Sequence, residues 1–314
     1  MRAVGTASAP RPDEFPLRDL VDEYRVALEV GGRSRRTIDW YRGYLDEFVA
    51  FVGRDGRSPT LDDLTPATSR RWLLAVQAAR SSPLAPNSMA GRVRTLRAFG
   101  GWVQRELALD AHPLAGLPLP KLPDVLVESL REREMRALVA AAGDQSRNPV
   151  RDRAIVLLLL DSGLRLGELV GLRVRDLDLV EGRCRVVGKG AKERIVPIGG
   201  RSRRALRAWL MTRGAPKGDA VLFVGRSGEV LSPRGVQLLV GRLARAAEIS
   251  TRCSPHVLRH SFARAFLANG GDVFTLQRIL GHSPTSLQIT RRYVQLLDDD
   301  VRAVHRRASP VDRL

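Results

Sequence analysis

A proline-rich stretch interrupts this sequence and limits its fold more than any other feature. Residues 110–124 (DAHPLAGLPLPKLPD) contain four prolines and show no helical period. Because proline lacks a backbone N–H and stiffens the chain, we expect an extended connection over 110–127. The chain has 314 residues, enough for two ordinary domains. We therefore expect one domain at 16–109, after a disordered lead-in at 1–15, and a second domain at 128–314.

The first of these segments has the pattern of a small helical domain. Apolar residues recur at helical spacing in four stretches, and Ser, Thr and Pro near the starts of two of them favour helix initiation. The expected helices span 17–29, 35–52, a range that begins at Pro66, and 87–108. Four arginines and one glutamate surround the apolar stripe of the last stretch: Arg92, Arg94, Arg97, Arg105 and Glu106. We therefore expect at least one basic helix in this domain.

The second segment is expected to be helical with one exception. The expected helices lie near 131–142, 153–160, 165–172, 202–212, 233–247, 256–268, 272–280 and 285–297. Two short β-prone runs, RCRVV and RIVPI, flank the sequence GKGAK, which is typical of a hairpin turn. The sequence thus predicts a mainly α fold with a small antiparallel β-sheet.

The charge of the chain limits the kind of partner it binds. The formal net charge is +18, and residues 121–314 supply +15 of it. Such an excess favours a polyanionic partner, nucleic acid first, although an arginine-rich composition without a specific role is an alternative. Two cysteines are too few for a disulfide framework, and no apolar run is long enough to cross a bilayer. We therefore expect a cytoplasmic protein without a membrane partner.

Two scarce residue types mark positions of chemical interest. Only four of the 52 basic residues are lysine, and two of these, Lys189 and Lys192, lie in the sequence GKGAKER. Arginine keeps its proton at accessible pH, whereas lysine can release it when its surroundings lower its pKa. Tyr293 is the only tyrosine in the last 270 residues.

The sequence SPHVLRH carries a candidate anion site. Ser254 is a favourable N-cap, so His256 and Arg259 lie three residues apart on one face near the positive end of a helix. That arrangement suits a phosphate group. A solvated surface pair is the plainer alternative. A metal site with Cys253, His256 and His260 is disfavoured, because no further ligand completes it and a guanidinium stands between the histidines.

Three further motifs are weak when each is taken alone. In SGLRLGEL, Glu168 can hold Arg165 by an i,i+3 contact, so that the planar guanidinium faces phosphate oxygens; a structural ion pair is the alternative. In LGHS, Gly281 is expected to end a helix in a left-handed turn from which His282 projects. In ITRRYVQL, Tyr293 falls in the middle of a helix, where a core tyrosine is the alternative.

The order of these motifs is far more specific than any one of them. An Arg–Glu pair, a GKGxKxR hairpin, HxxRH, LGH and a tyrosine follow one another from residue 165 to residue 293. This arrangement resembles the tyrosine recombinase family, which includes phage integrases and Xer-type recombinases, over residues 128–314. Residues 16–109 resemble the helical, SAM-like core-binding domain of that family more loosely.

The resemblance implies a catalytic set of six residues: Arg165, Lys189, His256, Arg259, His282 and Tyr293. By this resemblance the two arginines grip the scissile phosphate, and the second histidine hydrogen-bonds it. The first histidine helps to accept the proton of the nucleophilic tyrosine. The hairpin lysine, with Lys192 also within reach, protonates the leaving 5′ oxygen. Glu168 is implied to support the site from behind.

The resemblance also implies how such an enzyme works and assembles. It implies a two-domain clamp on double-stranded DNA, a covalent 3′-phosphotyrosine intermediate, and no ATP, metal or other cofactor. Four protomers, identical or of two kinds, are expected on two DNA sites, with the C-terminal tail docked on a neighbour. The role implied is DNA recombination of an Xer-like or transposon type, as opposed to a phage integrase with an extra arm-binding domain.

Alternatives to recombination remain at this point. A type IB topoisomerase uses similar chemistry, but the compact two-domain build favours a recombinase. A non-catalytic DNA-binding protein is disfavoured because all six catalytic positions are filled, and a metal-dependent nuclease because carboxylates are not clustered. Eleven residues separate His282 from Tyr293, more than is usual in the family. We expect a longer loop around Pro284 to absorb the difference.

Overall fold

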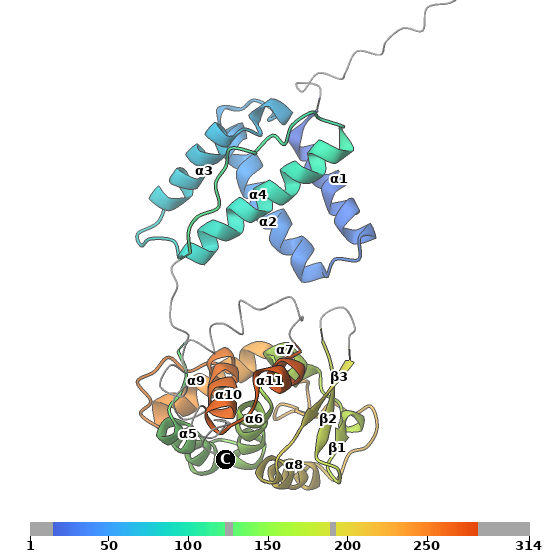
Figure 1. Ribbon diagram of the computed structural model, residues 1–314, viewed down its shortest axis with the longest axis vertical. Coiled ribbons are helices and arrows are strands. Elements are labelled where there is room, and N and C mark those ends of the chain that lie inside the picture. Colours follow the sequence, from blue (N-terminus) through green and yellow to red (C-terminus); the bar gives the residue numbers. More distant parts are fainter. Residues whose placement is uncertain (1–14, 123–127, 189–192, 282–314) are drawn as a thin grey trace, which may run out of the picture. The chain divides into compact units, whose positions relative to one another are not determined.

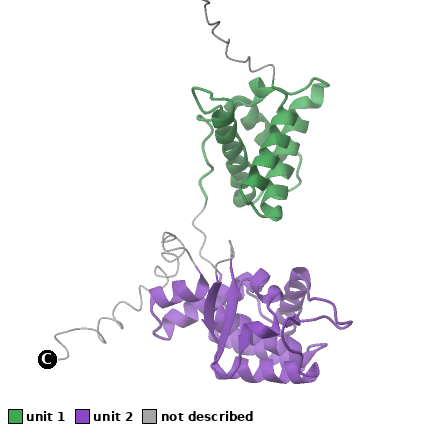
Figure 2. Ribbon diagram, turned by 90° about the vertical axis from the view of Figure 1, so that its right-hand side faces the viewer, with its two compact units in different colours: residues 1–124 green, residues 125–314 purple. Residues whose placement is uncertain are grey.

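The chain folds into two compact units, residues 1–124 and 125–314. The structure is a computed structural model that describes residues 15–122, 128–188 and 193–281. Figures 1 and 2 show that each unit has its own set of packed elements. The division falls inside the segment 110–127 that the sequence marks as a connection.

The described part of the first unit consists of helices. Its four α-helices, coloured blue to blue-green in Figure 1, are α1 (Leu17–Val30), α2 (Arg35–Val52), α3 (Pro66–Ala78) and α4 (Pro86–Glu106). Two 3₁₀ turns, Gly53–Asp55 and Leu61–Asp63, lie between α2 and α3. The side chains of Ser34 and Thr65 accept hydrogen bonds from the backbone N–H groups of Thr37 and Thr68, which confirms the expected starts of α2 and α3.

All four helices contribute to the core of this unit. Its buried aromatic side chains are Tyr24, Phe48, Trp72, Phe99 and Trp102. The rings of Phe48 and Trp72 meet edge to face with centroids 5.4 Å apart, a favoured aromatic geometry. Each large apolar side chain that is fully buried here stabilises the unit by about 1.5–3 kcal/mol.

The first part of the expected connection belongs to this core. Leu114 and Leu117 are buried, with 0% and 2% of their surfaces exposed. The ring of His112 lies against Gly100, and its Nδ1 accepts a hydrogen bond of 2.9 Å from the N–H of Leu114. Its Nε2 then donates to the carbonyl of Arg97 at 3.0 Å. This part of the segment is therefore packed onto α4, whereas the sequence predicted an extended chain.

Arg92 is also placed differently from the sequence-based expectation. It is 6% exposed, and its guanidinium donates to Glu47 at 2.9 Å and lies 4.5 Å from the ring centroid of Tyr44. A buried charge needs such partners. The sequence pointed to Glu106 as the one acidic residue near these arginines, whereas a glutamate 45 residues earlier in the chain pairs with Arg92.

The described part of the second unit combines helices with one small sheet. The helices are α5 (Glu132–Asp144), α6 (Pro149–Ser162), α7 (Leu166–Gly171), α8 (Gly200–Thr212), α9 (Pro233–Ala246), α10 (Pro255–Ala268) and α11 (Val273–Leu280), with a 3₁₀ turn at Val174–Asp176. The strands β1 (Leu177–Asp178), β2 (Arg183–Val187) and β3 (Glu193–Pro197) form an antiparallel sheet in the order β1-β2-β3. The expected mainly α fold with a small antiparallel sheet is confirmed.

The strands on either side of the candidate hairpin turn, β2 and β3, pair with each other. Val187 pairs with Glu193, and Val186 pairs with Arg194. The strands predicted from RCRVV and RIVPI are thus present and adjacent. β1 was not predicted, because two residues are too few to produce a sequence pattern.

Helix α6 forms the centre of the second unit. It packs against α5, α8 and α10, and its residues Ile155, Leu158 and Leu159 are fully buried. A helix that is covered on most sides carries no one-sided apolar stripe, which explains the unbroken run of apolar residues here. Helix α11 lies against β3 and α10, so the ends of α6, α10 and α11 are held near one another.

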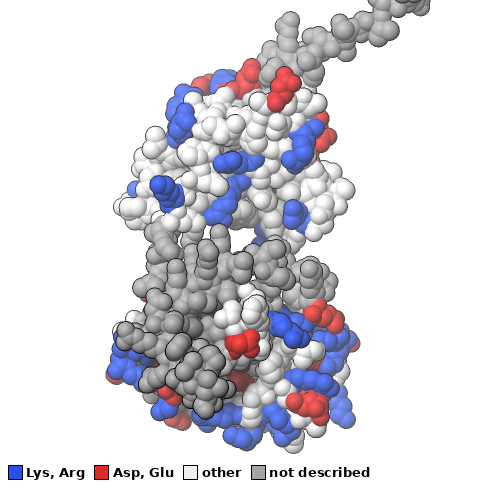
Figure 3. Space-filling view, in the orientation of Figure 1, with Lys and Arg blue, Asp and Glu red and all other residues white. Residues whose placement is uncertain are grey.

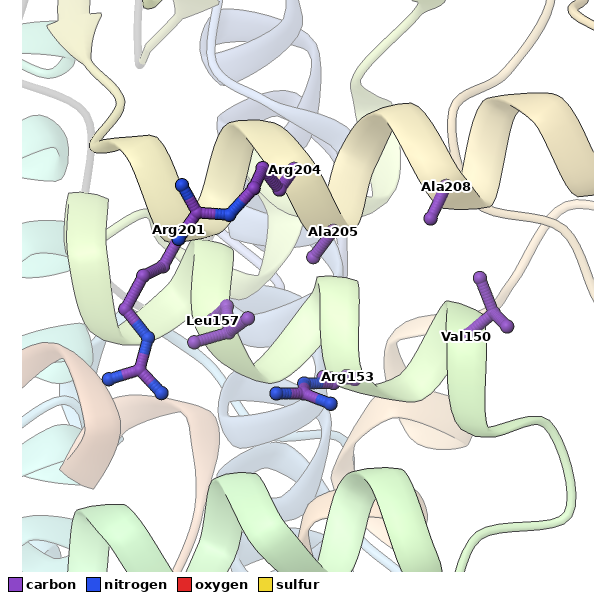
Figure 4. A pocket seen from close by; sticks show the side chains of 7 residues that line it. All are labelled: Val150, Arg153, Leu157, Arg201, Arg204, Ala205 and Ala208. Atoms are coloured by element: carbon purple, nitrogen blue, oxygen red, sulfur yellow. The ribbon is translucent and has the colours of Figure 1, made fainter.

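A groove lies between the first half of α6 and α8 (Figure 4). It has a volume of about 280 Å³, and three arginines line it, Arg153 from α6 and Arg201 and Arg204 from α8. None of the three forms an ion pair with an acidic residue of the described chain.

Two general properties follow from the described residues. On the face shown in Figure 3, Lys and Arg side chains are spread over both units, so positive charge is not confined to one of them there.

No helix among the described residues is both long enough and apolar enough to span a membrane.

Candidate active site at the end of helix α11

The turn after α6 is the first element of the site. Gly163 has a left-handed conformation with φ of +60°, which favours glycine. A Cβ atom at this position would clash with the ring of Phe262 and lie 2.8 Å from the side chain of Leu280. The turn therefore brings the backbone carbonyl of Gly163 close to α10 and α11, and only glycine fits there.

Arg259 on α10 is held by this turn. It is 5% exposed, and its guanidinium donates to the carbonyl of Gly163 and, at 2.9 Å, to the carbonyl of Leu280. The side chain of Ser254 caps the same helix, as predicted. The guanidinium is therefore fixed between the last residues of α6 and α11.

Arg165 occupies the N-cap position of α7. Its N–H donates to Glu168 at 2.7 Å, and its guanidinium donates to the same carboxylate at 3.0 Å. The expected i,i+3 contact is thus present. A second donor of the guanidinium reaches the carbonyl of Gly281 at 3.4 Å. Because 43% of this side chain is exposed, it faces solvent and also contacts the end of α11.

Glu168 has a second partner that sequence reasoning did not assign. Arg194 on β3 donates to both of its carboxylate oxygens at 2.8 Å, and donates through Nε to the carbonyl of Ile279 at 2.7 Å. Burial raises the pKa of Glu168, but the hydrogen bonds from Arg194 and from the N–H of Arg165 outweigh it, so the net shift is downward. Glu168 therefore stays ionised at neutral pH. The signal in the sequence was the final arginine of GKGxKxR.

Three arginines thus converge on the C-terminal end of α11. The acceptors are consecutive carbonyls: Ile279 for Arg194, Leu280 for Arg259 and Gly281 for Arg165. The last carbonyls of a helix lack partners within the helix and carry its partial negative charge, so cations stabilise them. This end of α11 therefore brings together three side chains from β3, α10 and the start of α7.

The turn that follows α11 also requires glycine. Gly281 has φ of +62°, as predicted for a left-handed helix end. A Cβ atom there would lie 2.9 Å from Cδ of Arg194. The side chain of Asp272 caps the start of α11 by accepting a hydrogen bond from the N–H of Thr275, in agreement with the helix expected near 272–280.

His256 lies near the start of α10 and has a histidine partner. Its Nε2 is 2.8 Å from Nε2 of His260, one turn later on the helix. Burial lowers the pKa of His256, and the charge of Arg259 lowers it further. A neutral imidazole is therefore favoured near pH 7, which is the form that accepts a proton. The partnership with His260 was not predicted, although the i,i+4 spacing in HxxRH was the available signal.

The metal alternative gains no support from the geometry around Cys253. Burial raises the pKa of this thiol to about 11, and Glu134 adds to the effect. The thiol is therefore protonated at neutral pH in the protein without a metal ion. Within residues 15–122, 128–188 and 193–281, no group of three or more His, Cys, Asp or Glu side chains is placed to hold a metal ion.

Part of the predicted set lies outside the described residues. These positions are Lys189, Lys192, His282 and Tyr293. The described residues that flank them are Val187 and Glu193 in the paired strands and Gly281 at the end of α11. Of the predicted set, the structure thus describes Arg165, His256 and Arg259, together with Glu168.

Comparison with known proteins identifies the family. Residues 128–299 match the Phage integrase family. The tyrosine recombinase XerC of Mycobacterium bovis is 38% identical over 303 residues, which cover 94% of this chain and 98% of the relative. XerC of Pelobacter propionicus is 33% identical over 300 residues, which cover 95% of this chain and 97% of the relative.

A solved structure of low sequence identity has the same fold. The Tn1549 transposon integrase in complex with transposon right end DNA aligns with a TM-score of 0.72 at 18% identity. The alignment covers 94% of this chain and 100% of that chain.

The chain therefore belongs to the phage integrase family of tyrosine recombinases. Its activity is that of a tyrosine-type site-specific recombinase, an enzyme that transfers DNA strands. The resemblance stated from the sequence motifs is confirmed.

Proposed function

We propose that this recombinase cuts and rejoins duplex DNA through a covalent 3′-phosphotyrosine link to Tyr293. The observation that carries the proposal is the convergence of Arg165 and Arg259 on the end of α11, with their guanidinium groups bonded to adjacent carbonyls. Two positive charges held close together repel each other, and a bound anion offsets that repulsion. In the chemistry of the family this anion is the phosphodiester of the DNA backbone.

The two arginines stabilise the reacting phosphate. When an oxygen nucleophile attacks a phosphodiester, negative charge builds up on the non-bridging oxygens, and fixed cations lower the barrier. Arg259 is rigidly anchored by two carbonyls, and Arg165 is held by Glu168 while part of it stays exposed. Hydrogen bonding by His282 to the same phosphate completes this part of the proposal.

Proton transfers accompany the exchange of bonds. The phenol of Tyr293 loses its proton, with the neutral imidazole of His256 as the acceptor, while its oxygen bonds to phosphorus. The bond from phosphorus to the 5′ oxygen breaks, and Lys189 gives that oxygen a proton. A phosphodiester replaces a phosphodiester, so the bond energy is kept and neither ATP nor a metal ion is required.

The assembly follows the family plan. Residues 16–109 are proposed as a core-binding domain and residues 128–314 as the catalytic domain, and together they clamp duplex DNA. Four protomers, of one kind or two, act on two DNA sites. The XerC relatives favour an Xer-like role in the cell.

Covalent trapping on a nicked duplex tests this proposal. The duplex carries the site that the full-length protein selects from a random-sequence pool, and EDTA is present throughout. A nick near the scissile phosphate releases a short strand after cleavage, so the covalent intermediate accumulates. We expect a protein–DNA adduct with the wild type and none with Tyr293→Phe. An adduct that persists with Tyr293→Phe would refute the assignment of the nucleophile.

A further inference from the structure

Arg194 is a largely buried charge that the proposed chemistry does not use. Only 11% of its side chain is exposed, and it lies on β3, one residue after the strand begins. Its guanidinium contacts Glu168 and the carbonyl of Ile279, both of them protein groups. A buried arginine costs free energy unless its contacts are well made.

Arg194 donates three hydrogen bonds whose geometry matches its planar guanidinium. Nη1 and Nη2 form a parallel pair of bonds with the two oxygens of Glu168, while Nε points to the carbonyl of Ile279. Such a planar fork fits a carboxylate, and a lysine ammonium cannot reproduce all three bonds from one nitrogen. Arg194 therefore connects α7 to the end of α11 in one defined geometry.

The turn at Gly281 rests directly on this side chain. A Cβ atom at Gly281 would lie 2.9 Å from Cδ and 3.1 Å from Nε of Arg194. Arg165 donates to the carbonyl of the same glycine. A displacement of Arg194 would therefore move both the carboxylate that holds Arg165 and the turn that Arg165 contacts.

We infer that Arg194 is a positioning residue for DNA cleavage, which holds Glu168, and through it Arg165, in register with the end of α11 where Arg259 is anchored. This inference rests on the proposed function, because it assigns the phosphate contact to Arg165 and Arg259. Arg194 itself contacts neither DNA nor the reacting atoms. Its effect is on the geometry of the charges that do.

The ionisation of Glu168 makes the proposed effect of Arg194 on DNA cleavage depend on pH. Glu168 is 6% exposed at its side chain, and burial alone would raise its pKa. The hydrogen bond from Arg194 is the foremost effect that lowers it. Without Arg194, Glu168 takes up a proton at higher pH, and its hold on Arg165 weakens as the pH falls. Loss of a purely structural contact would not produce this dependence.

The experiment compares variants of the full-length protein on the nicked duplex described above. The variants are Arg194→Met, Arg194→Lys, Glu168→Gln and the double variant Arg194→Met/Glu168→Gln. Arg204→Met is the control for loss of an arginine charge, because Arg204 lines the groove between α6 and α8 and takes no part in the bonds described above to Glu168 and to the end of α11. Single-turnover adduct formation, DNA affinity and melting temperature are measured for each protein over a series of pH values from about pH 5 to about pH 8.

We expect Arg194→Met to form the adduct about 10- to 100-fold more slowly, since a misplacement near 1 Å costs up to about 100-fold. DNA affinity should stay at the wild-type level, and Arg194→Lys should have an intermediate rate. The rate defect of Arg194→Met relative to the wild type should grow as the pH falls. The double variant should lack this growth and be no slower than the slower single variant, because both residues act in one network.

Several results would overturn the inference. One is that Arg194→Met forms the adduct at the wild-type rate. Another is that Arg204→Met loses as much rate as Arg194→Met. A third is that the rate loss of Arg194→Met parallels a loss of DNA affinity and does not depend on pH. If Arg194→Met does not fold, wild-type rates for both Arg194→Lys and Glu168→Gln would overturn it. The failure of the proposed function has a different pattern, because the wild-type protein then forms no adduct or the adduct persists with Tyr293→Phe.

Discussion

Gly163 offers a sharp test of how the site is built. Substitution with alanine puts a side chain at φ of +60°, which costs about 1–3 kcal/mol for a residue other than glycine. The new Cβ atom also clashes with Phe262 and lies 2.8 Å from Leu280. Overpacking of this kind costs a further 1–3 kcal/mol or so. We therefore expect Gly163→Ala to lower the free energy of unfolding of the second unit by about 2–6 kcal/mol.

The chain contains a matched control for this substitution four residues later. Gly167 lies in α7 with negative φ, and a Cβ atom added there would meet no atom within 4 Å, so Gly167→Ala should be neutral or stabilise by about 0.5–1 kcal/mol. Scanning calorimetry of both variants measures the difference. For a unit of this size, each kcal/mol shifts the melting temperature by about 2–4 °C, so Gly163→Ala should melt about 4–24 °C lower. Equal melting temperatures for the two variants would refute the packing argument at Gly163.

Three further predictions concern other parts of the chain. His112→Ala should lower the free energy of unfolding of the first unit by about 1–3 kcal/mol, because the ring makes two hydrogen bonds; urea titration measures this, and no change would show that the segment is not held by His112. The pKa of Glu168 is lowered by folding, so its contribution to stability is full above its unfolded pKa of about 4.3 and is lost as the pH falls through the folded value. The melting temperature of the second unit should therefore decline in acid less steeply for Glu168→Gln than for the wild type, and equal slopes would contradict the ionised state. DNA binding should weaken steeply and linearly on a plot of log affinity against log salt concentration, because phosphate contacts dominate, and a flat plot in a filter-binding assay would contradict that.

The sequence predicted those features of the fold that depend on neighbouring residues. The caps at Ser34, Thr65, Ser254 and Asp272 were predictable because a short polar side chain bonds a backbone N–H only three residues away. The left-handed turn at Gly281 is local in the same sense. The helix starts and the hairpin strands were therefore placed within a few residues of their observed ends.

The features that the sequence did not predict depend on distant residues. Arg92 is buried because Glu47 from another helix pairs with it, and neither position alone indicates the other. Leu114 is part of a core because His112 packs on α4, although the prolines around it are typical of an extended connection. In each case a tertiary contact outweighs the local pattern.

The candidate site shows the same division. Short motifs indicated Arg165, His256 and Arg259 as candidates. The structure places Arg165 at the start of α7 and the other two near the start of α10. The role of Arg194 was not predicted, because it depends on a contact with Glu168 across 26 residues and with Ile279 across 85 residues. Motifs thus indicated the candidate side chains, and the folded chain was needed to show what holds them.

The identity of the residue that carries DNA after cleavage tests the central claim most directly. The adduct formed by the wild-type protein on the nicked duplex is digested with nuclease and protease, and the modified peptide is sequenced by mass spectrometry. The account predicts a 3′-linked nucleotide on Tyr293, which is the only tyrosine in the peptides that follow residue 44. A nucleotide on any other residue, or strand cleavage without a covalent link, would contradict the account.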